Sequence, residues 1–184
     1  MPNWCNNEIT LTHADPVMIH RAAKAMSEGA FLREFIPMPP ELEGTTSPGD
    51  TPNWYTFCTN EWGTKWDVTC TDVEIPDVNT VTGSFDSAWS PPIAAYEKLT
   101  EMGFTISASY YEPGMGFVGR WDCGTNECYY TEYETSETVR ELIGAELDDC
   151  YSISEYMVEY EEEERCNIDF NSDATEPIQQ EKPQ

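Results

Sequence analysis

The stretch WDVTCTDVEIPDVNTVTGSFDSAW, residues 66–89, decides the fold because it contains two strand-forming segments with a turn between them. Trp66–Ile75 and Thr80–Trp89 are both rich in β-branched and aromatic residues, which favour strands. The link between them contains Pro76 and Asp77, two residues that favour turns. The stretch therefore predicts an antiparallel hairpin.

Upstream of this hairpin, the sequence predicts one strand followed by one helix. Asn6–Thr12 alternates apolar and polar residues, as a half-buried strand does. Asp15 and Pro16 then supply a helix N-cap and a first-turn proline. Gly29 supplies the end of the helix. Between these limits, apolar residues recur at helical spacing: Ile19, Ala22, Ala23 and Met26.

Downstream of the hairpin, the sequence predicts a second helix and a fourth strand. The helix begins at Ser90-Pro91 and ends at Gly103, and Phe104–Glu112 forms the strand. The complete order is strand–helix–strand–strand–helix–strand, which is the order of the ferredoxin-like fold. We therefore expect an α+β domain of ferredoxin-like (βαββαβ) type, with a four-stranded antiparallel sheet and its helices on one face.

This ferredoxin-like domain is predicted to cover residues 1–133. It carries an insertion at residues 31–62, where the prolines of FIPMPPEL exclude a long regular helix. A further hairpin over Gly116–Tyr133 forms the C-terminal part of the domain.

An acidic helical extension is predicted at residues 134–170. One helix is expected over Ser136–Leu147. A second is expected to open on Ser152-Ile-Ser-Glu155, which has the form of a capping box. Residues 171–184 are polar and contain proline, so they are expected to form a flexible tail.

Charge is the strongest functional signal in the composition. The 184 residues include 35 aspartates and glutamates against 9 lysines and arginines, a formal net charge of −26. Residues 93–184 carry 22 acidic and 5 basic residues, whereas residues 1–92 carry 13 and 4. Such a surface repels phosphate backbones and anionic lipids, so direct binding of nucleic acid or membrane is not expected. It attracts basic proteins instead.

The octapeptide NEWGTKWD, residues 60–67, allows two interpretations. Its tryptophans could form a corner of the fold, with Gly63 turning the chain and Lys65 lying over an indole ring. They could also form an exposed platform for a ligand. The corner is favoured because large aromatic side chains are mostly buried, and the platform stays open.

Six blocks, MPNWCNN, PMPPEL, NWYTF, NEWGTKWD, FDSAWSPP and YYEPGMGFVG, occur in this order over about Met1–Gly119. Together they resemble the YubB-type ferredoxin-like-domain proteins of bacteriophages and conjugative plasmids, which include the Api-type phage proteins. The resemblance implies a ferredoxin-like fold and a mobile-element origin, and it implies no catalytic residues. The positions on its motifs are expected to be structural: Trp54, Trp62, Gly63, Lys65, Trp66, Asp67, Trp89, Ser90 and Pro91.

Signals for catalysis, cofactors or metals are weak. Gly114–Gly119 has the spacing Gly-x-Gly-x-x-Gly, but a strand and a turn follow it, so a hairpin or bulge is favoured over a dinucleotide loop. Cys123 and Cys128 are predicted to face each other across a turn, without the two further ligands that zinc needs. No catalytic residue, cofactor or metal site is predicted. Without a signal peptide or an apolar run of about 18 residues, the chain is expected to be cytoplasmic in a bacterial host.

The acidic run near the C-terminus is the predicted binding site. Glu155, Glu159 and Glu163 recur every four residues, which places them on one helical face about 6 Å apart. Tyrosines interleave with the carboxylates, as in protein interfaces. The predicted partner-binding residues are Glu141, Asp148, Asp149, Glu155, Tyr156, Glu159, Tyr160, Glu162 and Glu163.

The leading hypothesis is a non-enzymatic, DNA-mimic-like inhibitor that occludes a basic surface of a host protein. The expected partner is a defence nuclease, a CRISPR-type effector or another nucleic-acid-binding protein. One alternative is a regulatory or assembly domain whose acidity confers only solubility, with a homodimer through the open sheet edge. A second alternative is an enzyme with an unidentified pocket.

Overall fold

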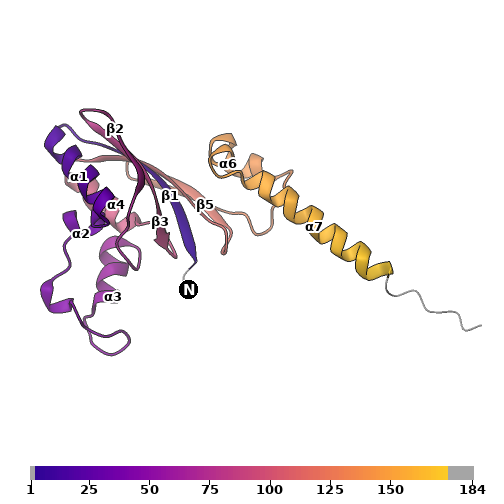
Figure 1. Ribbon diagram of the computed structural model, residues 1–184, viewed down its shortest axis with the longest axis horizontal. Coiled ribbons are helices and arrows are strands. Elements are labelled where there is room, and N and C mark those ends of the chain that lie inside the picture. The colour runs from indigo at the N-terminus through magenta and orange to yellow at the C-terminus, as the bar shows by residue number, and fades with distance from the viewer. Residues whose placement is uncertain (1–2, 174–184) are drawn as a thin grey trace, which may run out of the picture. The chain divides into compact units, whose positions relative to one another are not determined.

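The computed structural model describes residues 3–173, and the chain divides into two compact units, Met1–Glu132 and Tyr133–Gln184 (Figure 1). The first unit is an α+β domain with one antiparallel sheet, and the described part of the second unit is helical.

The sheet has six strands in the order β2-β3-β1-β4-β5-β6, and all neighbours are antiparallel. The strands are β1 (Trp4–Thr12), β2 (Thr71–Asp77), β3 (Thr80–Ala88), β4 (Thr105–Glu112), β5 (Phe117–Asp122) and β6 (Thr125–Tyr130). The expected four-stranded sheet is therefore too small. The predicted last hairpin, β5-β6, continues the sheet, because β5 pairs with β4 over its whole length, from Ser107–Asp122 to Glu112–Phe117.

Helices α1 (Pro16–Glu28) and α4 (Ile93–Glu101) lie on the same side of the sheet (Figure 1). They bury Ile19 and Tyr96 against one face of it, with alternate residues of the strands. The inward positions of the three central strands are Ile9 and Leu11, Val81 and Phe85, and Ile106 and Ala108. This alternation is the period-two pattern of a sheet with one buried face.

The limits of α1 are those that the sequence predicts. The Asp15 carboxylate accepts a hydrogen bond from the Val17 N–H at 2.9 Å, and Pro16 is the first helical residue. Gly29 ends the helix at φ 70°, a left-handed conformation that glycine adopts without steric cost.

Strand β2 begins at Thr71, whereas the sequence predicted a strand from Trp66. The reason is Asp67, whose carboxylate accepts the Leu32 N–H at 2.8 Å and the Arg33 N–H at 3.1 Å. These bonds tie the segment before β2 to the start of helix α2 (Phe31–Phe35). The turn of the hairpin is Val78-Asn79, the second half of the predicted link, because Pro76 and Asp77 belong to β2. Asp77 accepts the Asn79 N–H at 2.8 Å.

The segment at residues 31–62 contains four short helices. These are α2, the 3-10 turn η1 (Pro40–Leu42), α3 (Trp54–Phe57) and the π-helical turn η2 (Cys58–Trp62). The carboxamide of Asn53 caps α3 by accepting the Thr56 N–H at 3.0 Å.

The second unit contains α5 (Val139–Ile143), α6 (Ala145–Tyr151) and α7 (Ile153–Asp173). The predicted single helix over Ser136–Leu147 is wrong, because Gly144 adopts φ 84° and ψ 157° and separates α5 from α6. Helix α7 continues through Asp173, three residues into the predicted tail. The rest of that tail, residues 174–184, lies outside the described residues. No helix within residues 3–173 has the length and apolar composition needed to cross a bilayer.

Candidate functional site

Helix α7 carries most of the predicted binding residues on one exposed side. Glu155, Glu159, Glu162 and Glu163 stand at positions i, i+4, i+7 and i+8, and all four side chains are exposed. This spacing places them on one helical face. Tyr156 and Tyr160 flank these carboxylates, and their side chains are 63% and 64% exposed. We call these six residues the acidic face of α7.

Helix α7 is anchored within the second unit by residues that do not belong to the acidic face. Ile153 is buried, and the Glu161 carboxylate accepts the Ser136 N–H at 2.9 Å and the Ser136 hydroxyl at 2.8 Å. The backbone hydrogen bond from Ser136, with the hydroxyl bond, lowers the pKa of Glu161. Glu161 therefore holds the helix in place, whereas the carboxylates of the acidic face do not.

Asp148 was predicted to bind a partner, but the structure gives it an internal role. Its side chain is only 2% exposed. Its carboxylate accepts the Ser154 N–H at 2.8 Å and the Ser154 hydroxyl at 2.7 Å. Asp148 thus caps the first turn of α7. The predicted capping residue, Ser152, instead adopts a left-handed backbone at φ 51°.

Arg140 links Asp148 to its neighbour Asp149. The guanidinium lies 2.6 Å from an oxygen of each carboxylate. Burial raises the pKa of Asp148, but the hydrogen bonds from Ser154 and Arg140 outweigh burial, so that its pKa is lowered. Asp149 is 67% exposed, and Glu141 on α5 is also exposed. Because Asp149 shares the charge of Arg140 with Asp148, it is partly neutralised and has less charge to offer a partner than a glutamate of the acidic face has.

The acidic face carries negative charge that no salt bridge neutralises within the described residues. Within residues 3–173, no salt bridge involves Glu155, Glu159, Glu162 or Glu163. Unpaired like charges at i, i+4 spacing destabilise a helix by about 0.2–0.5 kcal/mol per pair. Exposed tyrosines beside them offer rigid apolar surface with a polar tip, which suits protein recognition. The face can therefore bind positive charge and bury aromatic surface together.

Most of the tryptophan motif forms a corner of the first unit. Trp62 is 4% exposed and donates its indole N–H to the Ile36 carbonyl oxygen at 2.9 Å. Gly63 adopts φ 84°, and a β-carbon there would lie 3.0 Å from the Ala94 backbone nitrogen. Ser90 donates its hydroxyl to the Gly63 carbonyl oxygen at 2.6 Å, beside the buried Pro91. These contacts join η2 to the start of α4.

Trp66 of the octapeptide and Trp89 of the FDSAWSPP block are exposed, which the corner interpretation does not anticipate. Trp66 packs on Trp4 with ring centroids 6.0 Å apart, and the predicted cation–π contact places the Lys65 ammonium 4.5 Å from the Trp66 ring centroid. Trp89 is 49% exposed and has φ 74°, which is rare for a bulky residue.

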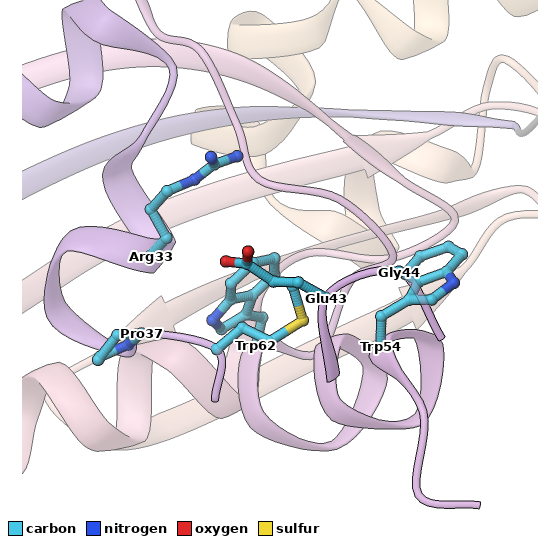
Figure 2. Close-up of a pocket in the computed structure, with 7 residues that line it drawn as sticks. Arg33, Pro37, Glu43, Gly44, Trp54 and Trp62 are labelled. Atoms are coloured by element: carbon cyan, nitrogen blue, oxygen red, sulfur yellow. The ribbon is translucent and has the colours of Figure 1, made fainter. Parts of the chain in front are cut away.

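A pocket of about 520 Å³ lies in the first unit, within the segment at residues 31–62 (Figure 2). Figure 2 shows Arg33 and Trp54 at opposite ends of its lining, with Trp62 and Glu43 between them. Its seven lining residues are Arg33, Pro37, Met38, Glu43, Gly44, Trp54 and Trp62. The volume is within the usual range for small-molecule sites. The lining includes no histidine, cysteine or serine that could act as a nucleophile or base.

Sequence reasoning missed this pocket, although four of its seven lining residues lie in three of the quoted blocks, PMPPEL, NWYTF and NEWGTKWD. PMPPEL and NWYTF are separated by a polar loop, and their convergence depends on Thr45. The Thr45 hydroxyl accepts the Trp54 N–H at 2.9 Å and donates to the Leu42 carbonyl oxygen at 2.7 Å. Such bonds from a side chain to the backbone leave no periodic signal in the sequence.

Two other expectations concern the β4–β6 region. The glycines of Gly114–Gly119 lie in the β4–β5 turn and in β5, and no helix follows them, in agreement with the preference for a hairpin over a nucleotide loop. The predicted pairing of Cys123 with Cys128 across the turn is wrong, because Cys128 pairs with Gly119 in the β5–β6 register and Cys123 lies in the turn itself.

No family model matches this chain, and no curated protein matches it. Among solved structures, the chain is similar to the crystal structure of the protein api92 from Yersinia pseudotuberculosis, which carries the family model DUF1281. The TM-score is 0.50 and the sequence identity is 10%, over 71% of this chain and 98% of that chain. At this identity the similarity shows the fold alone, and it supports at most an Api-type relationship.

Proposed function

We propose that this protein is a non-enzymatic acidic protein that binds and occludes a basic surface of another protein. The observation that carries the proposal is the acidic face of α7, with four exposed carboxylates that no described cation neutralises. Repulsion between these carboxylates destabilises the free helix, and a basic partner would relieve it. The charges would also accelerate association in a salt-dependent way.

The partner is a nucleic-acid-binding surface of a host defence or DNA-processing protein. Glu155, Glu159 and Glu163 repeat about every 6 Å along the helix axis, which resembles the regular spacing of phosphates along a nucleic-acid strand. A groove that is lined with lysine and arginine for phosphates would accept such a row of carboxylates. The protein would act by competitive occlusion, as a DNA mimic does.

The proposal includes a ferredoxin-like core, a phage or plasmid origin and a cytoplasmic location in the bacterial host. The order β2-β3-β1-β4, with α1 and α4 on one face, supports the ferredoxin-like assignment. The resemblance of the motif blocks to YubB-type proteins supports the origin. The strands β5 and β6 are then an addition at one edge of that core.

The test compares two triple variants with the same charge change. One variant carries Glu155→Gln, Glu159→Gln and Glu163→Gln on α7. The control carries Glu74→Gln, Glu97→Gln and Glu101→Gln, three exposed carboxylates of the first unit without a salt bridge within the described residues. Immobilised wild-type and variant proteins are incubated with bacterial lysate at about 50 mM and about 500 mM salt, and retained proteins are identified by mass spectrometry.

We expect a basic nucleic-acid-binding protein on the wild type and on the control variant at low salt, and its loss on the α7 variant. Added wild-type protein should also displace DNA or RNA from the purified partner in a gel-shift assay. Equal loss on both variants would mean that net charge alone causes retention. Unchanged retention on the α7 variant is the outcome that the solubility alternative implies. Failure to displace nucleic acid would contradict occlusion.

A further inference from the structure

We infer that the pocket of the first unit binds a small organic cation that carries alkyl groups, such as a quaternary ammonium ion. Its walls are mainly apolar: the indoles of Trp54 and Trp62, the thioether of Met38 and the ring of Pro37. Tryptophan attracts cations through its ring quadrupole more strongly than other aromatic side chains do. The thioether is polarisable and adapts to alkyl groups. These walls therefore suit a cation with an apolar coat.

The charge of the lining also favours a cation. Glu43 is exposed and takes part in no salt bridge within the described residues. Arg33, the one cationic residue of the lining, places its Nε atom 2.8 Å from the Asp67 carboxylate, which is 4% exposed. The Arg33–Asp67 pair is neutral as a unit, so that Glu43 leaves the pocket with a net negative charge. The net charge of −26 on the whole chain attracts cations in addition.

Hydrogen bonds hold the walls in place before any ligand arrives. Thr45 joins the loop that carries Glu43 and Gly44 to the first residue of α3, Trp54. The Trp62 indole N–H is bound to Ile36, so it is not available to an anion. A preformed site of this kind loses little conformational entropy on binding.

This inference is independent of the proposed function, because the pocket and the acidic face of α7 belong to different units. The ligand is small because the walls come from short segments at residues 33–62 and enclose about 520 Å³. That volume is sufficient for a quaternary ammonium with a short substituent.

The test uses three probes of nearly equal shape. Choline is the cation, 3,3-dimethylbutan-1-ol is its neutral isostere, and 3,3-dimethylbutanoate is the corresponding anion. Each is titrated into the uniformly ¹⁵N-labelled full chain, and binding is followed by the indole N–H resonances of Trp54 and Trp62. The variants are Glu43→Gln and the matched control Glu41→Gln, an exposed carboxylate two residues away that does not line the pocket.

We expect choline to shift both indole resonances and to bind about tenfold more tightly than the neutral isostere, with weaker binding of the anion. Glu43→Gln should weaken choline binding about three- to fivefold, and Glu41→Gln should leave it unchanged. The inference is overturned if choline does not shift these resonances or if the isostere binds equally well. It is also overturned if the anion binds best, because Arg33 would then be the recognition group.

Discussion

Replacing Asp148 by alanine tests whether this residue caps α7, as its contacts indicate. The variant removes a capping oxygen from the Ser154 N–H, which typically contributes about 1 kcal/mol. It also removes a charged hydrogen bond to the Ser154 hydroxyl, which contributes about 1.5 kcal/mol or more. The ion pair with Arg140 adds less than about 1 kcal/mol, because the Arg140 side chain is 47% exposed. Together these losses predict a destabilisation of about 3 kcal/mol.

Hydrogen exchange of the amides in the first turn of α7 is the appropriate assay, because it reports local opening in a chain of two units. A loss of about 3 kcal/mol corresponds to exchange more than about a hundredfold faster. Asp149→Ala is the matched control: it contacts the same guanidinium at 2.6 Å, but it is exposed and no bond from it to α7 is recorded among the described residues. We expect Asp149→Ala to accelerate exchange less than about fivefold.

The variant Asp148→Asn separates the cap from the charge. Asparagine also caps helices well, so this variant should retain the bond to the Ser154 N–H and lose the charge-dependent part. Its effect should lie between those of Asp149→Ala and Asp148→Ala. Equal effects of Asp148→Ala and Asp149→Ala would refute the reasoning, because the ion pair with Arg140 would then account for the whole effect.

The remaining predictions concern acid stability, the corner glycine and the thiols. Because the pKa of Asp148 is lowered, its charge stabilises the folded state above the unfolded pKa of about 3.9, and this contribution is lost as the pH falls through the lower folded value. The protection of the first α7 amides against hydrogen exchange should therefore fall in that acid range in the wild type. The decrease that is due to Asp148 should be absent when the Asp148→Asn variant is measured over the same pH range. Gly63→Ala should destabilise the first unit by about 1–3 kcal/mol in chemical denaturation, because the added β-carbon would crowd the backbone at the start of α4 and alanine would be held at an unfavourable φ. Gly124→Ala, at φ 91° with open space around it, should cost only about 1 kcal/mol, and equal effects would contradict the role of the close approach. Burial raises the pKa of Cys5 to about 12, so alkylation at pH 8 mapped by mass spectrometry should modify the exposed Cys128 and spare Cys5 until the protein unfolds; equal rates would contradict this.

The sequence predicted those elements whose limits are set by residues close to them in the chain. Asp15, Pro16 and Gly29 fix the limits of α1 within a few residues of themselves, so the sequence reveals them directly. The start of β2 could not be found in this way. It depends on Asp67 bonding to Leu32 and Arg33, more than thirty residues away, and no spacing rule reports such a pair.

The size of the sheet was missed for a related reason. A hairpin is visible in sequence through its turn, and Cys123-Gly124 between β5 and β6 is such a turn. Whether its first strand, β5, also pairs with a strand of the preceding sheet is decided by packing. Here the inward positions of β5 include Trp121, which lies 6.0 Å from the Tyr96 ring of α4 and extends the same core. The alternation of β5 was consistent with either outcome.

The candidate site shows the limit of reasoning from charge alone. Asp148 and Asp149 are adjacent, chemically identical and equally acidic in the sequence, so charge patterning assigns both to one surface. Their separation arises from Gly144, at which α6 begins, and the left-handed residue Ser152, at which α6 ends. These limits place Asp148 where it can reach the first turn of α7. A buried carboxylate is stable only with such partners, whereas an exposed carboxylate needs none. The carboxylates without partners are therefore the ones available to another molecule, and on α7 these are the glutamates of its acidic face.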